Sequence, residues 1–159
     1  MFIIIINKIM DNTDILILKA LQENGRISMK ELGKKVNLTS PAVTERVKKL
    51  EEKDIIQGYK AIINPEKLGL IIETYTSVAL HPSKINSFKS LVQSEEAIME
   101  CHRITGNDSM TIRILAKDRI ELEMLLEKIQ KLGTTKSSII LSTILENKII
   151  LPRSDENEK

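Results

Sequence analysis

Apolar positions in the first part of the chain recur at the spacing of α-helices. Asp11 or Asn12 can cap a first helix, and Gly25 can end it. The inward-facing positions of this predicted helix are Ile15, Leu18, Leu21 and, in part, Ile17. A later helix is marked by a buried stripe at i, i+4 and i+7, formed by Val43, Val47 and Leu50.

Polar residues mark where a second and a third helix begin. Ser28 is followed three residues later by Glu31, which is the spacing of a capping box. Asn37 follows this short second helix, and Asn tolerates the left-handed conformation that a sharp turn requires. Ser40 is predicted as the N-cap of the third helix, with Pro41 at its first position. The segment is therefore predicted to hold three helices, the last two joined by a tight turn.

The pattern changes to alternating strands and helices from residue 55 onward. The predicted strands are 55–65, 74–80, 98–104, 109–116 and 137–150, and the predicted helices are 84–94 and 119–133. Gly106, Asn107 and Asp108 form a hairpin-turn signal between two of the strands. The order from residue 74 is β-α-β-β-α-β, which predicts a ferredoxin-like antiparallel sheet with two helices on one face.

The predicted strand 137–150 is apolar on both of its faces. Ile140 and Ile144 point one way, because side chains alternate along a strand. The opposite side carries Ile139, Leu141 and Leu145. Two helices can cover only one face of a sheet, so this strand requires a second cover. We expect that cover to be a second subunit; the alternative is a loop or the N-terminal segment of the same chain.

Composition places the chain among folded proteins of a reducing compartment. Hydrophobic residues make up 42% of its 159 residues, charged residues 29% and aromatic residues only 3%, so the core is predicted to consist of Ile, Leu, Val and Met. Cys101 is the single cysteine, which excludes an intramolecular disulfide and favours the cytoplasm. No apolar run reaches the roughly 18 residues of a membrane span, so no membrane is expected as a partner.

The N-terminal stretch MFIIIINKIM allows three interpretations. A secretory signal has little support, because no positive region precedes the apolar run and no small-residue cleavage site follows it. The other two interpretations are an extra β-strand and a start codon placed too early, with Met10 as the natural start. Residues 1–9 are therefore assigned no function.

Positive charge is concentrated around the predicted second and third helices. The whole chain carries a net charge of +2, whereas residues 28–50 contain six bases and two acids and so carry +4. The bases are Lys30, Lys34, Lys35, Arg46, Lys48 and Lys49, and the acids are Glu31 and Glu45. Such a surface is typical of nucleic-acid binding, although a solvated helix surface gives the same count.

Two helices joined by a tight turn, the second of them basic, form the helix-turn-helix pattern. Gly33 is small where the third helix is expected to cross the second, and small residues keep the start of the third helix narrow enough for a major groove about 12 Å wide. The predicted groove-facing residues are Ser40, Pro41, Thr44, Glu45 and Lys48. The predicted phosphate contacts are Lys30, Lys34, Lys35 and Lys49. Arg46 is predicted either to join the DNA contacts or to pair with a local acid.

The sequence Glu100-Cys101-His102 invites a catalytic or metal-binding interpretation, which the strand pattern excludes. Adjacent residues of a strand point to opposite faces, so Cys101 and His102 cannot act together. The other histidine, His81, stands far away in the sequence, and a zinc site would need further ligands. Cys101 is predicted to be a small buried apolar residue. The chain is predicted to be neither an enzyme nor dependent on a metal or cofactor.

Several motifs follow one another in a specific order. They are a first helix with Asp14, Ile15, Ile17 and Leu18, then NGRIS at 24–28, ELGKKVNL at 31–38, ERVKKLE at 45–51, IIQGYKAIINPEKLG at 55–69 and ECHRITG at 100–106. Together they resemble the leucine-responsive/AsnC-type (Lrp/AsnC, feast/famine) transcriptional regulators. The resemblance implies an α+β chain with a winged helix-turn-helix domain and a ferredoxin-like (RAM/ACT-like) βαββαβ domain that forms homodimers and often octamers. It also implies that amino acids bind between the C-terminal domains.

The hairpin at 106–109 departs from the pattern of that family. Amino-acid-responsive members have a sequence similar to G-D-x-D, whereas this chain has Gly106, Asn107, Asp108 and Ser109. Asn107 and Ser109 stand where the two carboxylates would, and neither supplies the negative charge that pairs with an ammonium group. These four residues are the candidate effector site. The departure favours another small molecule, or none, over leucine-type sensing.

The expected organisation is an extra segment 1–9, a helix-turn-helix domain 10–54, a strand linker 55–66, a ferredoxin-like domain 67–151 and a polar tail 152–159. The expected function is a transcriptional regulator that binds duplex DNA through the helix at 40–53 and oligomerises through its C-terminal domain. One alternative is an effector-independent architectural DNA-binding protein. The alternative from another class is a ligand-binding regulatory subunit that does not bind DNA.

Overall fold

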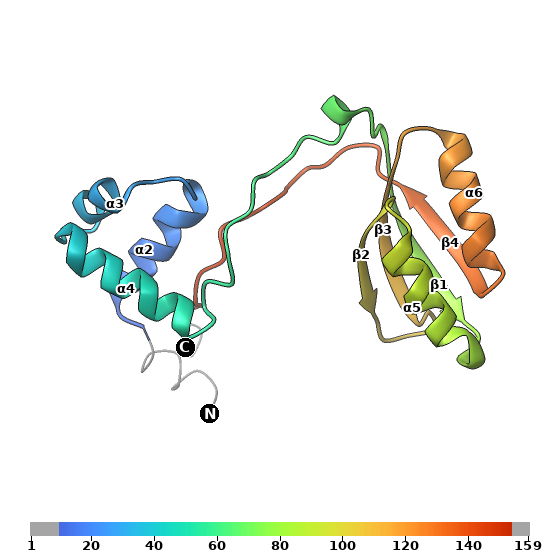
Figure 1. The fold of residues 1–159 in the computed structure, drawn as a ribbon, viewed down its shortest axis with the longest axis horizontal. Coiled ribbons are helices and arrows are strands. Elements are labelled where there is room, and N and C mark those ends of the chain that lie inside the picture. Colours follow the sequence, from blue (N-terminus) through green and yellow to red (C-terminus); the bar gives the residue numbers. More distant parts are fainter. Residues whose placement is uncertain (1–9, 154–159) are drawn as a thin grey trace, which may run out of the picture. The chain divides into compact units, whose positions relative to one another are not determined.

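The computed structural model describes residues 10–153, which divide into two compact units (Figure 1). The N-terminal unit extends to Ile62 and includes the chain again from Leu145 onward, and the second unit is Ile63–Ile144. The sequence assigns the residues from Leu145 to the ferredoxin-like domain, whereas they group with the N-terminal unit. The Gln22 amide accepts from the N–H of Ile150 at 2.8 Å and donates to its carbonyl at 2.9 Å. The interpretations of residues 1–9 lie outside the described residues.

The N-terminal unit contains three helices, which are α2 (Asn12–Glu23), α3 (Met29–Lys35) and α4 (Ser40–Glu52). One apolar core joins them, and Ile17, Leu32 and Val43 are completely buried in it. Ile17 is thus a central core residue, whereas the predicted inward residue Ile15 is only half-buried. The apolar stripe of α4 is buried as predicted.

Local hydrogen bonds begin the first two of these helices at predicted residues. Asp11 is the N-cap of α2, and Ser28 and Glu31 form the predicted capping box of α3. Hydrogen bonds from Ser28 lower the pKa of the Glu31 carboxyl. Asn37 takes the left-handed conformation, with φ 55°, as predicted for the sharp turn. Signals that act over three or four residues therefore operate here as the sequence indicates.

The second unit is an antiparallel four-stranded sheet with two helices on one face (Figure 1). Its elements are β1 (Ile72–Leu80), α5 (Ile85–Ser94), β2 (Ile98–Arg103), β3 (Met110–Ala116), α6 (Arg119–Gln130) and β4 (Gly133–Ile139), with short 3-10 helices η1 (Glu66–Leu68) and η2 (Pro82–Lys84). The strand order is β2-β3-β1-β4, so the predicted ferredoxin-like arrangement is confirmed. Val78, Phe88, Ile112 and Ile129 are completely buried between the sheet and the helices.

The last strand ends much earlier than its apolar sequence predicts. β4 ends at Ile139, which lies opposite Thr74 of β1. The N–H of Ile140 makes one further hydrogen bond, to the Glu73 carbonyl at 2.9 Å. Because β1 itself begins at Ile72, only two residues of partner strand remain beyond Thr74, and the ladder cannot continue to residue 150. The predicted strand to residue 150 is therefore wrong.

Two further predictions fail for the same reason, which is the absence of a neighbouring strand within the described chain. Residues 55–65 contain bends and chain without regular structure, and no strand. Leu141 and Ile144 are 94% and 99% exposed and lie outside any strand, so they do not form the predicted two-sided apolar strand.

The predicted helix 119–133 ends at Gln130, because Gly133 begins β4.

The sheet face that the helices leave open is polar. Arg113 of β3 lies between Glu73 of β1, at 2.6 Å, and Glu100 of β2, at 3.1 Å. Glu73 in particular, together with Glu100, raises the pKa of Arg113. Tyr75 stands beside Arg113 in the register and is exposed.

Cys101 is exposed on the edge strand β2 and not buried as predicted, because an edge strand has a neighbour on one side only.

Candidate nucleic-acid interface

α4 turns one side into the core and the other to solvent. The predicted groove-facing residues are on the solvent side, where Ser40 is half-exposed and Pro41, Thr44, Glu45 and Lys48 are exposed. The Thr44 hydroxyl donates to the Ser40 carbonyl at 2.7 Å. Its proton is therefore occupied, which leaves the hydroxyl lone pairs and the methyl group available to a base edge.

The beginning of α4 differs from the predicted cap by one residue. The N-cap is Thr39 and not Ser40, because the Thr39 hydroxyl accepts from the Ala42 N–H at 3.4 Å. Pro41 consequently lies at the second helical position, where its missing N–H still costs no helical hydrogen bond. The first turn of α4 thus consists of small side chains, as the groove hypothesis requires.

Exposed lysines near α4 form loose ion pairs with acids on the same unit. Lys49 lies 3.4 Å from Glu45 and Lys48 lies 3.6 Å from Glu52, each pair one helical turn apart. Lys35 of α3 lies 3.9 Å from an α2 carboxylate, that of Glu23. Pairs this exposed are worth about 1 kcal/mol or less, so a phosphate can replace the carboxylate at little cost. Lys30 and Lys34 have no ion-pair partner within residues 10–153.

The local charge of +4 predicted from residues 28–50 does not describe the folded unit. Residues 10–54 contain nine bases and eight acids, and several of these acids lie beside the predicted DNA-binding bases. The positive charge available to DNA therefore depends on which bases can exchange their carboxylate partner for a phosphate. Counting charge in a sequence window cannot reveal this, because Lys35 and Arg46 find their acidic partners on α2.

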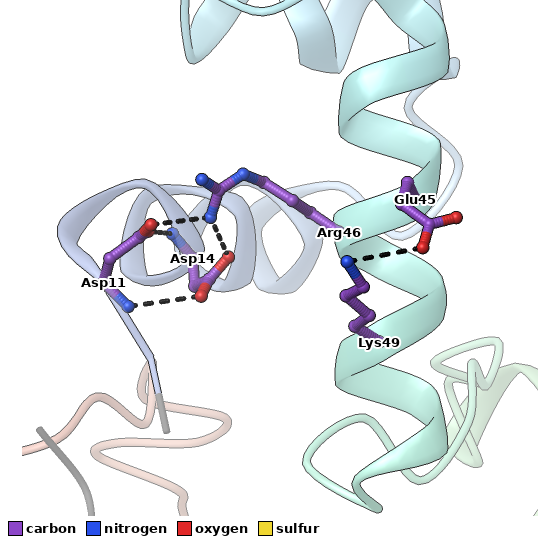
Figure 2. A network of polar contacts seen from close by, with 5 residues as sticks. All are labelled: Asp11, Asp14, Glu45, Arg46 and Lys49. Carbon is purple, nitrogen blue, oxygen red and sulfur yellow. Dashed lines mark hydrogen bonds and ion pairs between the residues drawn. The ribbon is translucent and has the colours of Figure 1, made fainter. Parts of the chain in front are cut away.

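Arg46 is the most firmly held of the predicted DNA-binding bases. Its Nη1 lies 2.8 Å from both Asp11 and Asp14 at the start of α2 (Figure 2). Hydrogen bonds from Asp14 first, and then Asp11, raise the pKa of Arg46. The sequence prediction missed the two aspartates as partners, although their spacing of three residues is the signature of a capping box.

Gly33 is required by the turn and not by the crossing of two helices. A Cβ at this position would lie 2.6 Å from the Leu38 carbonyl oxygen, which belongs to the turn before α4. The same turn is closed by a hydrogen bond from the Leu38 N–H to the Gly33 carbonyl, at 2.8 Å. The predicted close approach is present, but its partner is the turn backbone.

The candidate effector residues lie in the hairpin between β2 and β3. Gly106 has φ 109°, a left-handed conformation that favours glycine. Asn107 is exposed, whereas Asp108 and Ser109 are half-buried. The Ser109 N–H donates to the Val78 carbonyl at 2.9 Å, which ties the end of the hairpin to β1. The hairpin offers amide, hydroxyl and single carboxylate groups to a ligand.

Each unit also has a surface groove that the sequence did not indicate. A groove of about 1020 Å³ in the N-terminal unit is lined by Leu21, Gln22, Ile55, Tyr59, Ile150 and neighbouring residues. A groove of about 490 Å³ in the second unit is lined by Glu95, Lys117, Asp118, Glu121 and Lys128 among others. Lys128 and Glu95 pair across the second groove at 2.6 Å. No local sequence signal points to either groove, because each is formed by segments far apart in the chain.

Metal-binding and membrane-spanning features were sought in the described residues. Residues 10–153 contain no cluster of three or more His, Cys, Asp or Glu able to hold a metal ion. The helices within the same range are too short or too polar to cross a membrane. His102 Nε2 lies 3.5 Å from Glu100 Oε2 on the exposed edge strand.

Comparisons with known proteins cover both units. A winged helix-turn-helix DNA-binding model matches residues 10–57, and an Lrp/AsnC ligand binding domain model matches residues 73–150. The leucine-responsive regulatory protein of Haemophilus influenzae is 33% identical over 152 residues, covering 91% of this chain and 92% of that protein. LrpC of Bacillus subtilis is 33% identical over 135 residues, covering 85% and 94%.

Solved structures agree with these relatives. The structure of Bacillus subtilis LrpC matches with a TM-score of 0.81 at 32% identity, covering 85% of this chain and 96% of that chain. The crystal structure of a transcriptional regulator from Neisseria meningitidis in complex with L-methionine matches with a TM-score of 0.83 at 25% identity, covering 89% and 96%.

Proposed function

Because the chain belongs to the Lrp/AsnC family of helix-turn-helix, DNA-binding transcriptional regulators, we propose that α4 is the helix that enters the major groove of duplex DNA. Members of this family are regulators and not enzymes. The observation that carries the proposal is the division of α4 into a buried apolar stripe and an exposed polar side that begins with small residues. A helix of this kind fits a groove about 12 Å wide.

The exposed side chains divide into two groups by chemistry. Thr44 and Lys48 project from the exposed side of α4 and are proposed to contact base edges, with Ser40, Pro41 and Glu45 beside them. The flexible ammonium groups around this helix are proposed to neutralise phosphates, which supplies affinity that depends on salt. These phosphate contacts are Lys30, Lys34, Lys35 and Lys49.

Two substitutions test this assignment. Lys48→Glu is expected to weaken binding to any duplex by about tenfold, because it places a negative charge inside a groove that is flanked by the phosphates of both strands. Thr44→Ala is expected mainly to change the preference between the upstream region of the protein's own gene and a random duplex of equal length. Fluorescence anisotropy at several salt concentrations measures both effects.

A matched control separates the groove contact from the overall charge. Lys89→Glu makes the same change of charge at an exposed position of α5, in the other unit, and is expected to bind DNA like the wild type. If Lys48→Glu and Thr44→Ala also bind both duplexes like the wild type, α4 is not the groove helix. An equal loss in Lys48→Glu and Lys89→Glu would show a dependence on net charge alone.

We further propose that an amino acid or another small molecule controls DNA binding through the hairpin at Gly106–Ser109. The family match includes a ligand-binding domain, and the Neisseria meningitidis relative was solved with L-methionine. Asn107 and Ser109 supply hydrogen bonds but no charge, so affinity for an ammonium group is expected to be low. The double substitution Asn107→Asp/Ser109→Asp is expected to tighten amino-acid binding. Calorimetric titration with a panel of amino acids measures this change, and an unchanged affinity would place the ligand elsewhere.

Self-association is proposed because the segments that join the two units expose many apolar side chains. At least half of the side chain is exposed at Tyr59, Ile62, Ile63, Leu68, Ile71, Leu141, Ile144, Leu145 and Ile150. Exposed apolar side chains of this number mark an interaction surface, and a homodimer or a larger homo-oligomer such as an octamer would cover them. Sedimentation equilibrium decides this point: a monomer at micromolar concentration would contradict it.

The same DNA-binding experiments separate the alternative functions. Cooperative binding to both duplexes that no amino acid alters would favour an architectural protein. Loss of all DNA binding at physiological salt would favour a regulatory subunit that uses the ferredoxin-like unit alone. The proposed site of action is the cytoplasm, where chromosomal targets are accessible.

A further inference from the structure

Arg46 occupies the oxygen atoms that the capping box of α2 leaves unused. Within the box, Asp11 Oδ1 accepts from the Asp14 N–H at 2.9 Å, and Asp14 Oδ2 accepts from the Asp11 N–H at 3.2 Å. The remaining oxygens, Asp11 Oδ2 and Asp14 Oδ1, each accept from Arg46 Nη1 at 2.8 Å (Figure 2). One nitrogen atom of α4 thus binds the second oxygen of each of the two capping carboxylates.

We propose that Arg46 is a positioning residue that sets the orientation of α4 against α2, and that it does not contact DNA. This inference rests on the proposed function, in which α4 enters the groove. The two helices share an apolar core, whose packing sets their crossing angle only to within about 15–20°. A charge-assisted bridge to two carboxylates, each already held by a capping bond, adds a directional constraint.

Burial distinguishes Arg46 from the lysines on the same helix. The side chain of Arg46 is 34% exposed, whereas those of Lys48 and Lys49 are 66% and 60% exposed. Asp14 is only 15% exposed. If Arg46 turned away toward a phosphate, this largely buried carboxylate would lose its charged partner, which is unfavourable. A lysine on α4 can leave its exposed partner without such a penalty.

The chemistry of the guanidinium fits a bridge between two acids. It presents several N–H donors in a fixed planar arrangement, so one nitrogen can serve two carboxylates at once. A lysine ammonium also carries several donors on one nitrogen, but it is more strongly hydrated and sits on a flexible stem, so it is expected to hold the two carboxylates less firmly. The bridge is therefore expected to be weakened by Arg46→Lys and removed by Arg46→Met, which keeps an unbranched apolar side chain.

The first experiment is a double-mutant cycle on the full chain with Arg46→Met and Asp11→Asn. Asn retains the N-cap while it removes the charge, so the cycle isolates the bridge from the cap. Each single substitution is expected to lower the melting temperature by about 2–4 °C. In the Arg46→Met background, Asp11→Asn is expected to cause no further loss. Full additivity would show that the two residues do not act together and would overturn the proposal.

The second measurement uses a property that a purely stabilising contact would not change. At 15 °C, with each variant shown to be folded by circular dichroism, Arg46→Met is expected to reduce the ratio of affinities for the upstream and random duplexes by about threefold to tenfold. Arg46→Lys is expected to restore part of this ratio. The slope of log affinity against log salt is expected to stay unchanged, because no phosphate contact has been lost.

Three results would overturn the positioning role. A salt slope reduced by about one for each bound subunit would mean that Arg46 neutralises a phosphate. An unchanged affinity ratio in Arg46→Met would mean that the bridge only stabilises the unit. An unchanged melting temperature in both Arg46→Met and Asp11→Asn would mean that the bridge is absent in solution. Lys48→Glu, measured in parallel, reports separately on whether α4 contacts DNA at all.

Discussion

Each unit contains one arginine between two carboxylates, but the two arginines connect different kinds of element. Arg113 lies between Glu73 and Glu100, which stand on the strands on either side of β3. These strands are already joined by backbone hydrogen bonds along a fixed register. Arg46 joins α4 to α2, and the backbone hydrogen bonds of a helix stay within that helix.

The arginine that is more buried is not the one expected to matter more for the orientation of the elements it joins. The Arg113 side chain is 23% exposed and the Arg46 side chain is 34% exposed, so Arg113 forms the more protected pair. The sheet would nevertheless keep its register without Arg113, because the backbone ladder holds it. Between helices, side chains alone decide orientation. A more exposed ion pair can thus matter more for the geometry of a binding surface.

The largest effects are expected at the glycine in each unit that leaves no space for a Cβ. In Gly33→Ala the new Cβ would press against the Leu38 carbonyl, and in Gly133→Ala against the Ala79 carbonyl. Each substitution is expected to lower the free energy of unfolding by about 1–3 kcal/mol, because the backbone must shift. Urea unfolding followed by circular dichroism measures the loss.

A glycine with space around it provides the control for these two substitutions. A Cβ at Gly25 would meet its nearest atoms at 3.8 and 3.9 Å, which are ordinary contacts, so Gly25→Ala is expected to be nearly neutral. Gly33→Ala changes the N-terminal unit and should also weaken DNA binding. Gly133→Ala changes the second unit and should leave amide exchange in α2 and α4 unchanged. Equal losses in all three variants would contradict the importance of the close contacts.

A smaller effect is expected from the arginines themselves. Arg46→Met and Arg113→Met are each expected to lower the free energy of unfolding by about 1 kcal/mol, within the range of partly exposed ion pairs. Amide hydrogen exchange then distinguishes the two variants by where exchange becomes faster. Arg113→Met should accelerate exchange only at the edge strand β2, whereas Arg46→Met should accelerate exchange throughout α2. The comparison fails if Arg46→Met affects only the amides next to residue 46.

The smallest effect is the response of the N-terminal unit to acid. The Asp14 backbone N–H, followed by Arg46, lowers the pKa of Asp11 below its ordinary value of 3.8. Because the pKa of Asp11 is lower in the folded than in the unfolded state, its charged carboxylate stabilises the folded unit fully above the unfolded-state pKa. This stabilisation is lost as pH falls through the folded-state pKa. The difference in stability between wild type and Arg46→Met should therefore shrink below about pH 4. Urea unfolding from pH 6 to pH 3 measures this, and a constant difference would contradict it.

Local signals in the sequence determined much of the N-terminal unit. The capping box of Ser28 and Glu31, the left-handed Asn37 and the buried stripe of α4 all depend on residues at most seven positions apart. The solvent-exposed side of α4 follows from the same helical period. The ferredoxin-like order of strands and helices was predictable as well, because each element has its own apolar period.

Only the tertiary structure decided the ends of the strands and the partners of the charges. β4 ends close to the point where its partner strand β1 begins, although its sequence remains apolar beyond Ile139. Arg46 finds Asp11 and Asp14 more than thirty positions away in the chain, so no sequence window could pair them. The physical reason is common to both. Periodicity and capping act within one element, whereas a strand ladder and an ion pair need a second element brought close by the fold.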